Sequence, residues 1–198
     1  MPFVKNYFSD AKSIIDHMDC DTVEKMVEIL CSIREQAGRL FFLGVGGGSA
    51  NASHAVNDFR KIAGFEAYAP TDNVSELTAR VNDDGWETVF VKWLEDSRLG
   101  SKDGVFVFSV GGGSVEKNIS ANIVAALKHA EKVGAKIVGI VGRDGGYVKK
   151  VADACVVIPP VNPKTVTPHT EAFQGVVWHC LVSHPRLQKR EMKWESVQ

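Results

Sequence analysis

Four side chains in this sequence are of types that bind metal ions or transfer protons: His54, Asp58, Glu171 and His179. His54 and Asp58 are four residues apart in a segment expected to be helical, so they would share one helix face. Glu171 and His179 are eight residues apart, about two helical turns, and would also share a face. Two imidazoles and two carboxylates could bind zinc or another divalent ion, or could act as a general acid and base. Taken singly, each could equally be an ordinary surface group or a hydrogen-bonded core group.

Two glycine-rich segments follow expected strands and could bind a phosphate. They are Leu43-Gly44-Val45-Gly46-Gly47-Gly48-Ser49 and Phe108-Ser109-Val110-Gly111-Gly112-Gly113-Ser114. Glycine lets the backbone turn tightly and expose its N–H groups, and the N-terminus of a following helix adds donors and the positive end of its dipole. Two segments that both end in Gly-Gly-Gly-Ser favour an anionic ligand over ordinary connections between a strand and a helix.

Better-known phosphate motifs do not fit these segments. Neither contains Gly-x-x-x-x-Gly-Lys-Ser/Thr, so a P-loop is excluded, and the first is not a clean Gly-x-Gly-x-x-Gly. No acidic residue ends a second strand as a dinucleotide site requires. The sequence therefore favours a smaller ligand, such as a sugar phosphate.

The pattern of apolar residues predicts an α/β framework for these groups. Short apolar runs predict buried strands at 39–45, 104–110, 135–141 and 154–158, with a weaker strand at 65–69. Helices are expected at 3–19, 21–37, 50–63, 75–97, 115–133, 145–152 and 169–184. This alternation predicts a doubly wound parallel five-stranded sheet flanked by helices. We expect a single domain, 1–198, with an N-terminal helical arm (1–37), an α/β core (38–187) and a tail (188–198).

Composition excludes several classes of protein. The chain has 198 residues and a net charge of −1, so it lacks the surplus of basic residues that binds nucleic acid. No apolar run approaches the roughly 18 residues of a membrane span, and the first residues do not form a signal peptide. The four cysteines form no Cys-x-x-Cys pair, which is typical of reduced thiols in a cytoplasmic protein.

Three stretches match motifs of one known family. The segment Gly44-Val45-Gly46-Gly47-Gly48-Ser49-Ala50-Asn51-Ala52-Ser53-His54 is similar to that family's Gly-Asn-Gly-Gly-Ser-Ala-Ala-Asp-Ala-Gln-His. Asn82-Asp83-Asp84-Gly85 is similar to its Asn-Asp-Tyr-Gly. The last helix has an acidic residue and a histidine eight positions later, where the family has Gln and His. On these motifs, and over nearly its whole length, the chain resembles the sugar isomerase (SIS) domain and, within it, the phosphoheptose isomerases.

The resemblance implies a ketose–aldose isomerase that converts sedoheptulose 7-phosphate to D-glycero-D-manno-heptose 7-phosphate through an enediolate. It implies one zinc ion bound by His54, Asp58, Glu171 and His179, with Asp58 and His179 as the acid/base pair. It also implies a cytoplasmic homotetramer with sites between subunits. The substrate contacts that we expect on this basis are Gly46, Gly47, Gly48, Ser49, Asn82, Asp83, Ser109, Val110, Gly111, Ser114 and Glu171.

The chain also departs from the family. Asp58 stands where the family has Glu, Glu171 where it has Gln, and Gly48 where it has Ser. The family's Ser-Thr-Ser-Gly turn reads Ser109-Val110-Gly111-Gly112 here, so two hydroxyls are lost and phosphate binding should depend more on backbone N–H groups. The lost hydroxyls favour an alternative, a non-catalytic SIS module that binds a sugar phosphate as a sensor or serves as a protein scaffold. The retained four-residue set opposes it.

Overall fold

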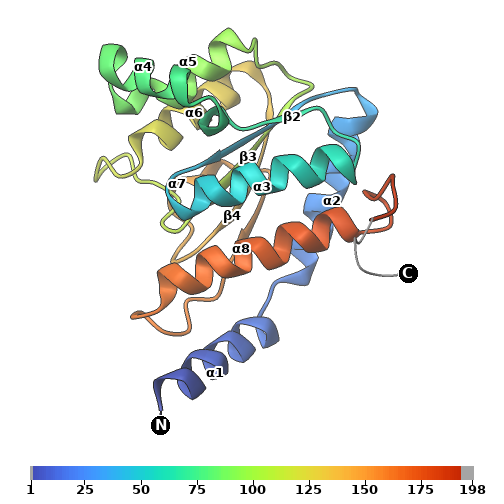
Figure 1. Ribbon diagram of the computed structural model, residues 1–198, viewed down its shortest axis with the longest axis vertical. Coiled ribbons are helices and arrows are strands. Elements are labelled where there is room, and N and C mark those ends of the chain that lie inside the picture. Colours follow the sequence, from blue (N-terminus) through green and yellow to red (C-terminus); the bar gives the residue numbers. More distant parts are fainter. Residues whose placement is uncertain (1, 193–198) are drawn as a thin grey trace.

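The computed structural model describes residues 2–192, and five strands in it form one sheet (Figure 1). The strands are β1 (Leu40–Gly44), β2 (Ala67–Tyr68), β3 (Gly104–Ser109), β4 (Lys136–Val141) and β5 (Ala154–Val157). Their order across the sheet is β2-β1-β3-β4-β5, and every neighbouring pair is parallel. The predicted α/β fold with a doubly wound five-stranded parallel sheet is confirmed.

Helices cover both faces of the sheet. They are α1 (Phe3–Asp16), α2 (Cys20–Glu35), α3 (Gly47–Lys61), α4 (Val74–Asp84), α5 (Val89–Asp96), α6 (Ala121–Val133), α7 (Gly146–Val151) and α8 (Val166–Ser183), with short 3-10 helices η1 (Pro70–Asp72) and η2 (Trp86–Thr88). α2, α3 and α8 pack on one face, and α5, α6 and α7 pack on the other. Within residues 2–192, none of these helices combines the length and apolar character that a membrane crossing requires.

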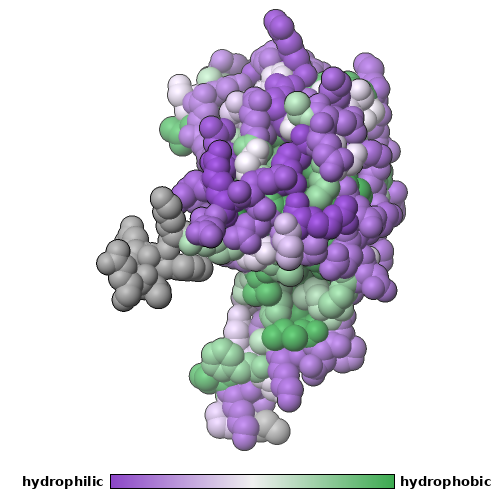
Figure 2. Space-filling view, turned by 90° about the vertical axis from the view of Figure 1, so that its right-hand side faces the viewer, coloured by the Kyte–Doolittle hydropathy of each residue, from purple (hydrophilic) through white to green (hydrophobic). Residues whose placement is uncertain are grey.

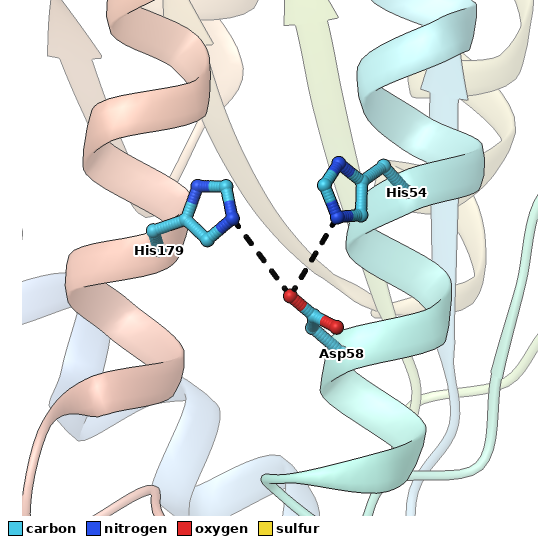
Figure 3. A group of neighbouring side chains, drawn as sticks. All are labelled: His54, Asp58 and His179. Carbon is cyan, nitrogen blue, oxygen red and sulfur yellow. Dashed lines mark ion pairs between the residues drawn. The ribbon is translucent and has the colours of Figure 1, made fainter. Parts of the chain in front are cut away.

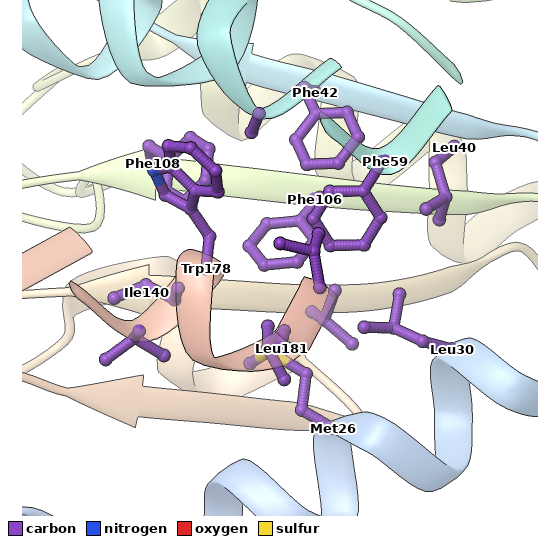
Figure 4. Close-up of a cluster of buried hydrophobic side chains, with 14 of the residues drawn as sticks. Met26, Leu30, Leu40, Phe42, Phe59, Phe106, Phe108, Ile140, Trp178 and Leu181 are labelled. Atoms are coloured by element: carbon purple, nitrogen blue, oxygen red, sulfur yellow. The ribbon is translucent and has the colours of Figure 1, made fainter. Parts of the chain in front are cut away.

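An aromatic cluster on the first face holds α3 and α8 against the sheet (Figure 4). Successive strand residues point to opposite faces, so Phe42 of β1 and Phe106 of β3 both face this side. Their rings stack with centroids 5.0 Å apart, and Phe59 of α3 packs on Phe42 at the same separation. Trp178 of α8 is also fully buried in this cluster. The packing therefore fixes α3 and α8 side by side, with their outer faces exposed.

Two of the expected helices differ most from the structure. The helix expected at 75–97 is divided into α4, η2 and α5, because Gly85 has a φ of 87°, which does not continue a helix. The helix expected at 115–133 begins only at Ala121. Before it, a loop closes on itself through an isolated bridge between Ser114 and Ile119.

Candidate metal and proton-transfer site

Three of the four residues predicted as metal ligands lie together between α3 and α8 (Figure 3). Asp58 Oδ2 is 3.9 Å from His54 Nε2 and 3.8 Å from His179 Nε2. One potential ligand atom from each residue lies within 4.8 Å of the other two. The Asp58 side chain is 15% exposed, whereas both imidazoles are more than half exposed. A ligand can therefore approach from solvent and meet all three groups at once.

Trp178 forms the wall behind both imidazoles. Its indole is 1% exposed. The His54 ring meets it edge-on with centroids 4.7 Å apart, and the His179 ring stacks on it at 3.5 Å. A buried, closely packed ring cannot move aside easily, so it limits the orientations that the two histidines can adopt.

A backbone contact indicates which ring nitrogen of His179 carries a proton. His179 Nδ1 is 2.7 Å from the carbonyl oxygen of Gly175, one helical turn earlier. A carbonyl oxygen can only accept a hydrogen bond, so Nδ1 carries the proton. In the neutral ring, Nε2 then presents its lone pair toward Asp58. This is the tautomer that binds a metal or accepts a proton.

The donor set and its spacing fit a divalent metal ion. Ligands about 2.1 Å from a tetrahedral zinc lie roughly 3.4 Å from one another. The separations of 3.8 and 3.9 Å in the triad (His54, Asp58 and His179) are close to this value, and small side-chain adjustments would close the difference. Two imidazoles and one carboxylate are a set that zinc accepts, and three protein ligands are the number usual in catalytic zinc sites.

Glu171, the fourth predicted ligand, lies apart from the triad. Its carboxyl group rests against Gly47 at the start of α3, where a Cβ on Gly47 would collide with it. Glu171 also lies about 12 Å from His179 along the α8 axis, because eight residues of helix separate them. A carboxylate thus occupies the positive end of the α3 dipole, the position that the sequence suggested for a phosphate.

Several hydrogen-bond donors of the first glycine-rich turn are used within the turn itself. Gly48 N donates to Val45 O, while Ser49 donates to Gly46 O through both its backbone N and its hydroxyl. Within residues 2–192, the N–H groups of Gly46 and Gly47 have no such acceptor. The turn therefore offers an incoming anion fewer donors than its sequence suggested.

The second glycine-rich segment does not lead directly into a helix, as the sequence suggested. Its glycines pack against the loop that follows β4: Val148 N donates to Gly112 O, and Tyr147 N donates to Gly113 O. A Cβ on Gly112 would collide with the backbone of Gly145. Close approach of two backbones therefore explains at least one of these glycines without any ligand.

The predicted phosphate serines of this segment differ in their availability. Ser109 Oγ accepts a hydrogen bond from Gly112 N at 3.0 Å and keeps its own proton free to donate. Ser114 Oγ donates to Glu116 at 3.0 Å and accepts from Lys117 N, so it is committed to its own loop and stands beside a carboxylate. Ser109 is therefore the better placed of the two to meet an anion. Val110 and Gly111 lie in the same loop, partly exposed.

The start of α6 presents donors that the sequence analysis did not identify. Ser120 is the N-cap residue, yet its hydroxyl makes no capping bond and its φ is 50°. Asn122 is fully buried, and its side-chain nitrogen has no hydrogen-bond partner within the described part of the chain. A serine just before the apolar run of α6 was a signal for this helix start, hidden by the glycines upstream.

The predicted sugar-binding pair lies at the end of α4. Asn82 and Asp83 are both exposed, and Asn82 Nδ2 donates to Asp83 Oδ1 at 2.7 Å. α4 packs against η1, η2 and α5. The structure therefore does not bring this pair to the triad.

Comparison with known proteins identifies the family and agrees with the fold. The family model of the SIS domain matches residues 6–142. A phosphoheptose isomerase from a Nitratiruptor species is 32% identical over 150 residues, which cover 73% of this chain and 74% of that protein. One from Helicobacter pylori is 30% identical over 81% of each chain. The lincomycin biosynthesis protein LmbN of Streptomyces lincolnensis is 29% identical over 91% of this chain and 68% of its own length.

Solved structures show the same fold. Phosphoheptose isomerase GmhA from Neisseria gonorrhoeae superposes with a TM-score of 0.77 at 23% identity, covering 90% of this chain and 95% of that one. A phosphoheptose isomerase from Francisella tularensis gives 0.74 at 21% identity, with coverage of 92% and 97%.

Proposed function

The chain belongs to the SIS domain family and, within it, to the phosphoheptose isomerases, and we propose that it interconverts sedoheptulose 7-phosphate and D-glycero-D-manno-heptose 7-phosphate. The observation that carries this proposal is the position of the Asp58 carboxylate. One of its oxygens lies less than 4 Å from an imidazole nitrogen of each of two histidines, on an open surface between α3 and α8. An aldose–ketose isomerase needs one group to move a proton between neighbouring carbons and another to move a proton between their oxygens.

The proposed chemistry begins with Asp58 as the base. Asp58 takes a proton from C1 of the open-chain ketose, and the electrons of that C–H bond form the C1=C2 double bond of an enediolate with its charge on O2. His179 Nε2 accepts the O1 proton and returns it to O2. Asp58 then gives its proton to C2 while the charge on O1 forms the aldehyde carbonyl. The hydrogen bond to Gly175 suits His179 for this transfer, because in the neutral imidazole it leaves the lone pair on Nε2.

We propose zinc as the ion that His54, Asp58 and His179 hold. When bound, it would polarise the substrate carbonyl and favour the enediolate charge. One lone pair on His179 Nε2 cannot bind a metal and accept a proton at once. The two roles are therefore alternatives, and the dependence of turnover on added zinc distinguishes them. Glu171 would contact the sugar from its place over Gly47 instead of completing the ligand set.

The phosphate would bind near the N-terminus of α6. Ser109 has a free hydroxyl proton, Ser120 has an unused hydroxyl, and the buried Asn122 amide lacks an acceptor within residues 2–192. Helix N-termini bind phosphate through free N–H groups and the dipole. Of the originally predicted contacts, Gly46 and Gly47 could add backbone donors. Ser114 is the weakest candidate, because Glu116 already takes its hydroxyl proton.

We propose a homotetramer, supported by the surface of α1. This helix projects from the rest of the molecule, and hydrophobic atoms gather on that narrow part (Figures 1 and 2). Among its residues, all of which the structure describes, only Ile14 is buried. Val4, Phe8 and Ile15 are each more than 60% exposed and share one face of the helix. An apolar face of this kind is costly to leave in water, and a second copy of the chain would cover it.

The remaining proposals concern location and organisation. Cys20, Cys31, Cys155 and Cys180 are all free thiols, which suits the reducing cytoplasm. We propose that the whole chain acts as a single SIS domain, since every described strand joins one sheet.

The proposed reaction is tested by incubating the purified protein with sedoheptulose 7-phosphate and following the aldehyde proton by NMR, with and without added zinc. Aldose should accumulate to a fixed ratio with the ketose, and the same ratio should be reached from the aldose side. Absence of turnover under both metal conditions would refute the isomerase proposal. A His179→Ala variant that still binds the sugar phosphate but does not convert it would place His179 in the chemistry.

A further inference from the structure

We propose that a cavity between the loop after β3 and the loop after β4 is a second binding site, for a small anion that carries two or more phosphate charges. The cavity has a volume of about 740 Å³ and is lined by residues from 111–119 and 143–150. Ligand pockets commonly have volumes of roughly 300–1,000 Å³. None of the triad residues lines it, nor does Glu171. The proposal goes beyond the isomerase reaction and does not depend on it.

The charges that line the cavity favour an anion. The positive groups are Lys117, Arg143, Lys149 and Lys150, and the negative groups are Glu116 and Asp144. Both carboxylates already interact with other groups that line the cavity. Glu116 accepts a hydrogen bond from Ser114 and lies 3.9 Å from Lys150 Nζ, and Asp144 accepts from Gly146 N.

Three cations remain to face the cavity. Within residues 2–192, Lys117, Arg143 and Lys149 have no carboxylate within 4.0 Å of their charged nitrogens. Arg143 offers the planar fork that binds phosphate oxygens in pairs, and lysines add point charges. The four cationic and two anionic side chains of the lining leave two positive charges in excess, and an anion with a single charge would compensate only one of them, which is why we assign a polyphosphate or diphosphate group.

The floor of the cavity is rigid. Gly142 N donates to Val110 O, and Tyr147 N and Val148 N donate to the carbonyls of Gly113 and Gly112. A Cβ on Gly146 would collide with the carbonyl oxygens of Gly111 and Gly113, so the two loops are in direct backbone contact. A preformed floor reduces the entropy lost on binding.

Arg143 is held at the cavity at a cost in backbone energy. Its φ of 51° lies in the left-handed region, which is unfavourable for a residue with a Cβ. Its side chain is exposed and makes no hydrogen bond within the described part of the chain. Arg143 thus lines the cavity with a guanidinium that has no carboxylate partner among the described residues.

The position of the cavity separates it from the proposed sugar site. Chain order reverses between β1 and β3, and ligands of doubly wound sheets bind at that reversal. The cavity lies one strand further on, at the carboxyl ends of β3 and β4. Gly111, Gly113 and Ser114 contribute to its lining.

The test is isothermal titration of the full-length, chelator-treated protein with inorganic pyrophosphate at low ionic strength. We expect saturable binding that weakens at least tenfold in Arg143→Ala and again in Lys149→Ala/Lys150→Ala. Lys102→Ala, just before the start of β3 at the opposite edge of the sheet, is the matched control and should bind as the parent does.

Two further variants identify the site that the probe occupies. Ser120→Ala and Asp58→Asn should both bind pyrophosphate with unchanged affinity, because neither residue lines the cavity. Loss of binding in Ser120→Ala alone would assign the probe to the sugar-phosphate site and overturn the proposal. No saturable binding to the parent, or equal affinity in the parent and Arg143→Ala, would overturn it as well. Either result would leave the isomerase proposal intact, since turnover is measured separately.

Discussion

The imidazole of His54 meets the indole of Trp178 edge-on, with 4.7 Å between the ring centroids. The same indole stacks on His179, so one buried ring restricts two proposed metal ligands from different helices. Trp178 cannot itself bind zinc or transfer a proton at neutral pH. Its contribution is to hold the two imidazoles in position, so replacing it should lower the affinity for metal more than it lowers the rate of proton transfer.

We therefore expect Trp178→Phe to weaken zinc binding on the order of tenfold, because the smaller ring leaves both imidazoles freer. Competition with a chromogenic chelator measures this. Zinc should also change the tryptophan fluorescence of the parent and leave that of Trp178→Phe nearly unchanged. Trp86→Phe, at an exposed position, is the control. Equal zinc affinity in parent and Trp178→Phe would show that the indole does not orient the ligands.

Replacing Asp58 with Asn should reduce kcat with sedoheptulose 7-phosphate by a factor of about 10² to 10⁴, the usual contribution of a general base. The amide keeps the size of the side chain but cannot accept the C1 proton. Asp58→Glu should retain measurable turnover, since it restores a carboxylate one methylene longer. Asp21→Asn, in the exposed first turn of α2, should be silent. Turnover in Asp58→Asn close to that of the parent would exclude Asp58 as the base.

The ion pair between Arg39 and Asp103 should make the stability of the fold depend on pH. Burial alone would raise the pKa of Asp103, but hydrogen bonds from the Arg39 side chain and from the N–H groups of Arg39 and Gly100 outweigh it and hold that pKa below its usual value. A carboxyl with a lowered pKa stabilises the folded state above about pH 4, and this stabilisation is lost as the pH falls through the folded-state pKa.

Asp103→Asn should thus lower the free energy of unfolding at pH 7 by on the order of 2 kcal/mol. Urea denaturation at pH 7 and near pH 2.5 measures the difference. It should shrink at the lower pH, because that pH lies below the ordinary aspartate pKa and the unfolded chain then binds a proton that the folded carboxylate must give up. The same loss at both values would mean that the charge of Asp103 contributes nothing.

The four thiols should react at different rates. Burial raises the pKa of Cys155 to about 12, so only about one molecule in 10⁴ carries the thiolate at pH 8. Burial first, and then the nearby Glu24 and Cys20, raise the pKa of Cys180 as well. Iodoacetamide at pH 8 should therefore label the exposed Cys20 well before Cys155, as followed by peptide mass spectrometry. Early labelling of Cys155 in the folded protein would contradict its burial.

The exposed face of α1 should determine the oligomeric state. Light scattering should give a mass about four times the chain mass of 21.6 kDa. Phe8→Asp should lower that mass, because it places a charge in the proposed contact. Asn6→Asp, on nearly the opposite side of the same helix, should not. A mass of one chain for the unaltered protein would refute the tetramer.

The sheet was predictable because a continuous apolar run, as at β1, β3, β4 and β5, indicates a strand buried on both faces. This signal does not depend on the conformation of the connecting loops. The triad pair His54 and Asp58 was predictable because four residues of helix place two side chains on one face. Both features depend on residues close together in the sequence, and the regular period of a helix or strand determines which of their side chains share a face.

Other features depend on contacts that the sequence pattern does not encode. Glu171 was expected to share a helix face with His179, yet its carboxyl group lies against Gly47. The spacing of residues along a helix does not predict this side-chain orientation. The two Gly-Gly-Gly-Ser segments look alike, but one begins a helix directly and the other forms a loop, with Asn118 and Ser120 at positive φ. Glycine permits both outcomes, and long-range packing on the loop after β4 decides between them.

The backbone contact of Gly112 with Gly145, and of Gly146 with Gly111, has a consequence for engineering. Neither loop can be transplanted alone from a relative with different side chains at these positions, because the first Cβ introduced would strike the backbone of the partner loop. A chimaera that exchanges 110–120 must exchange 142–148 with it. The two segments must therefore change together, although 21 residues separate them in the chain.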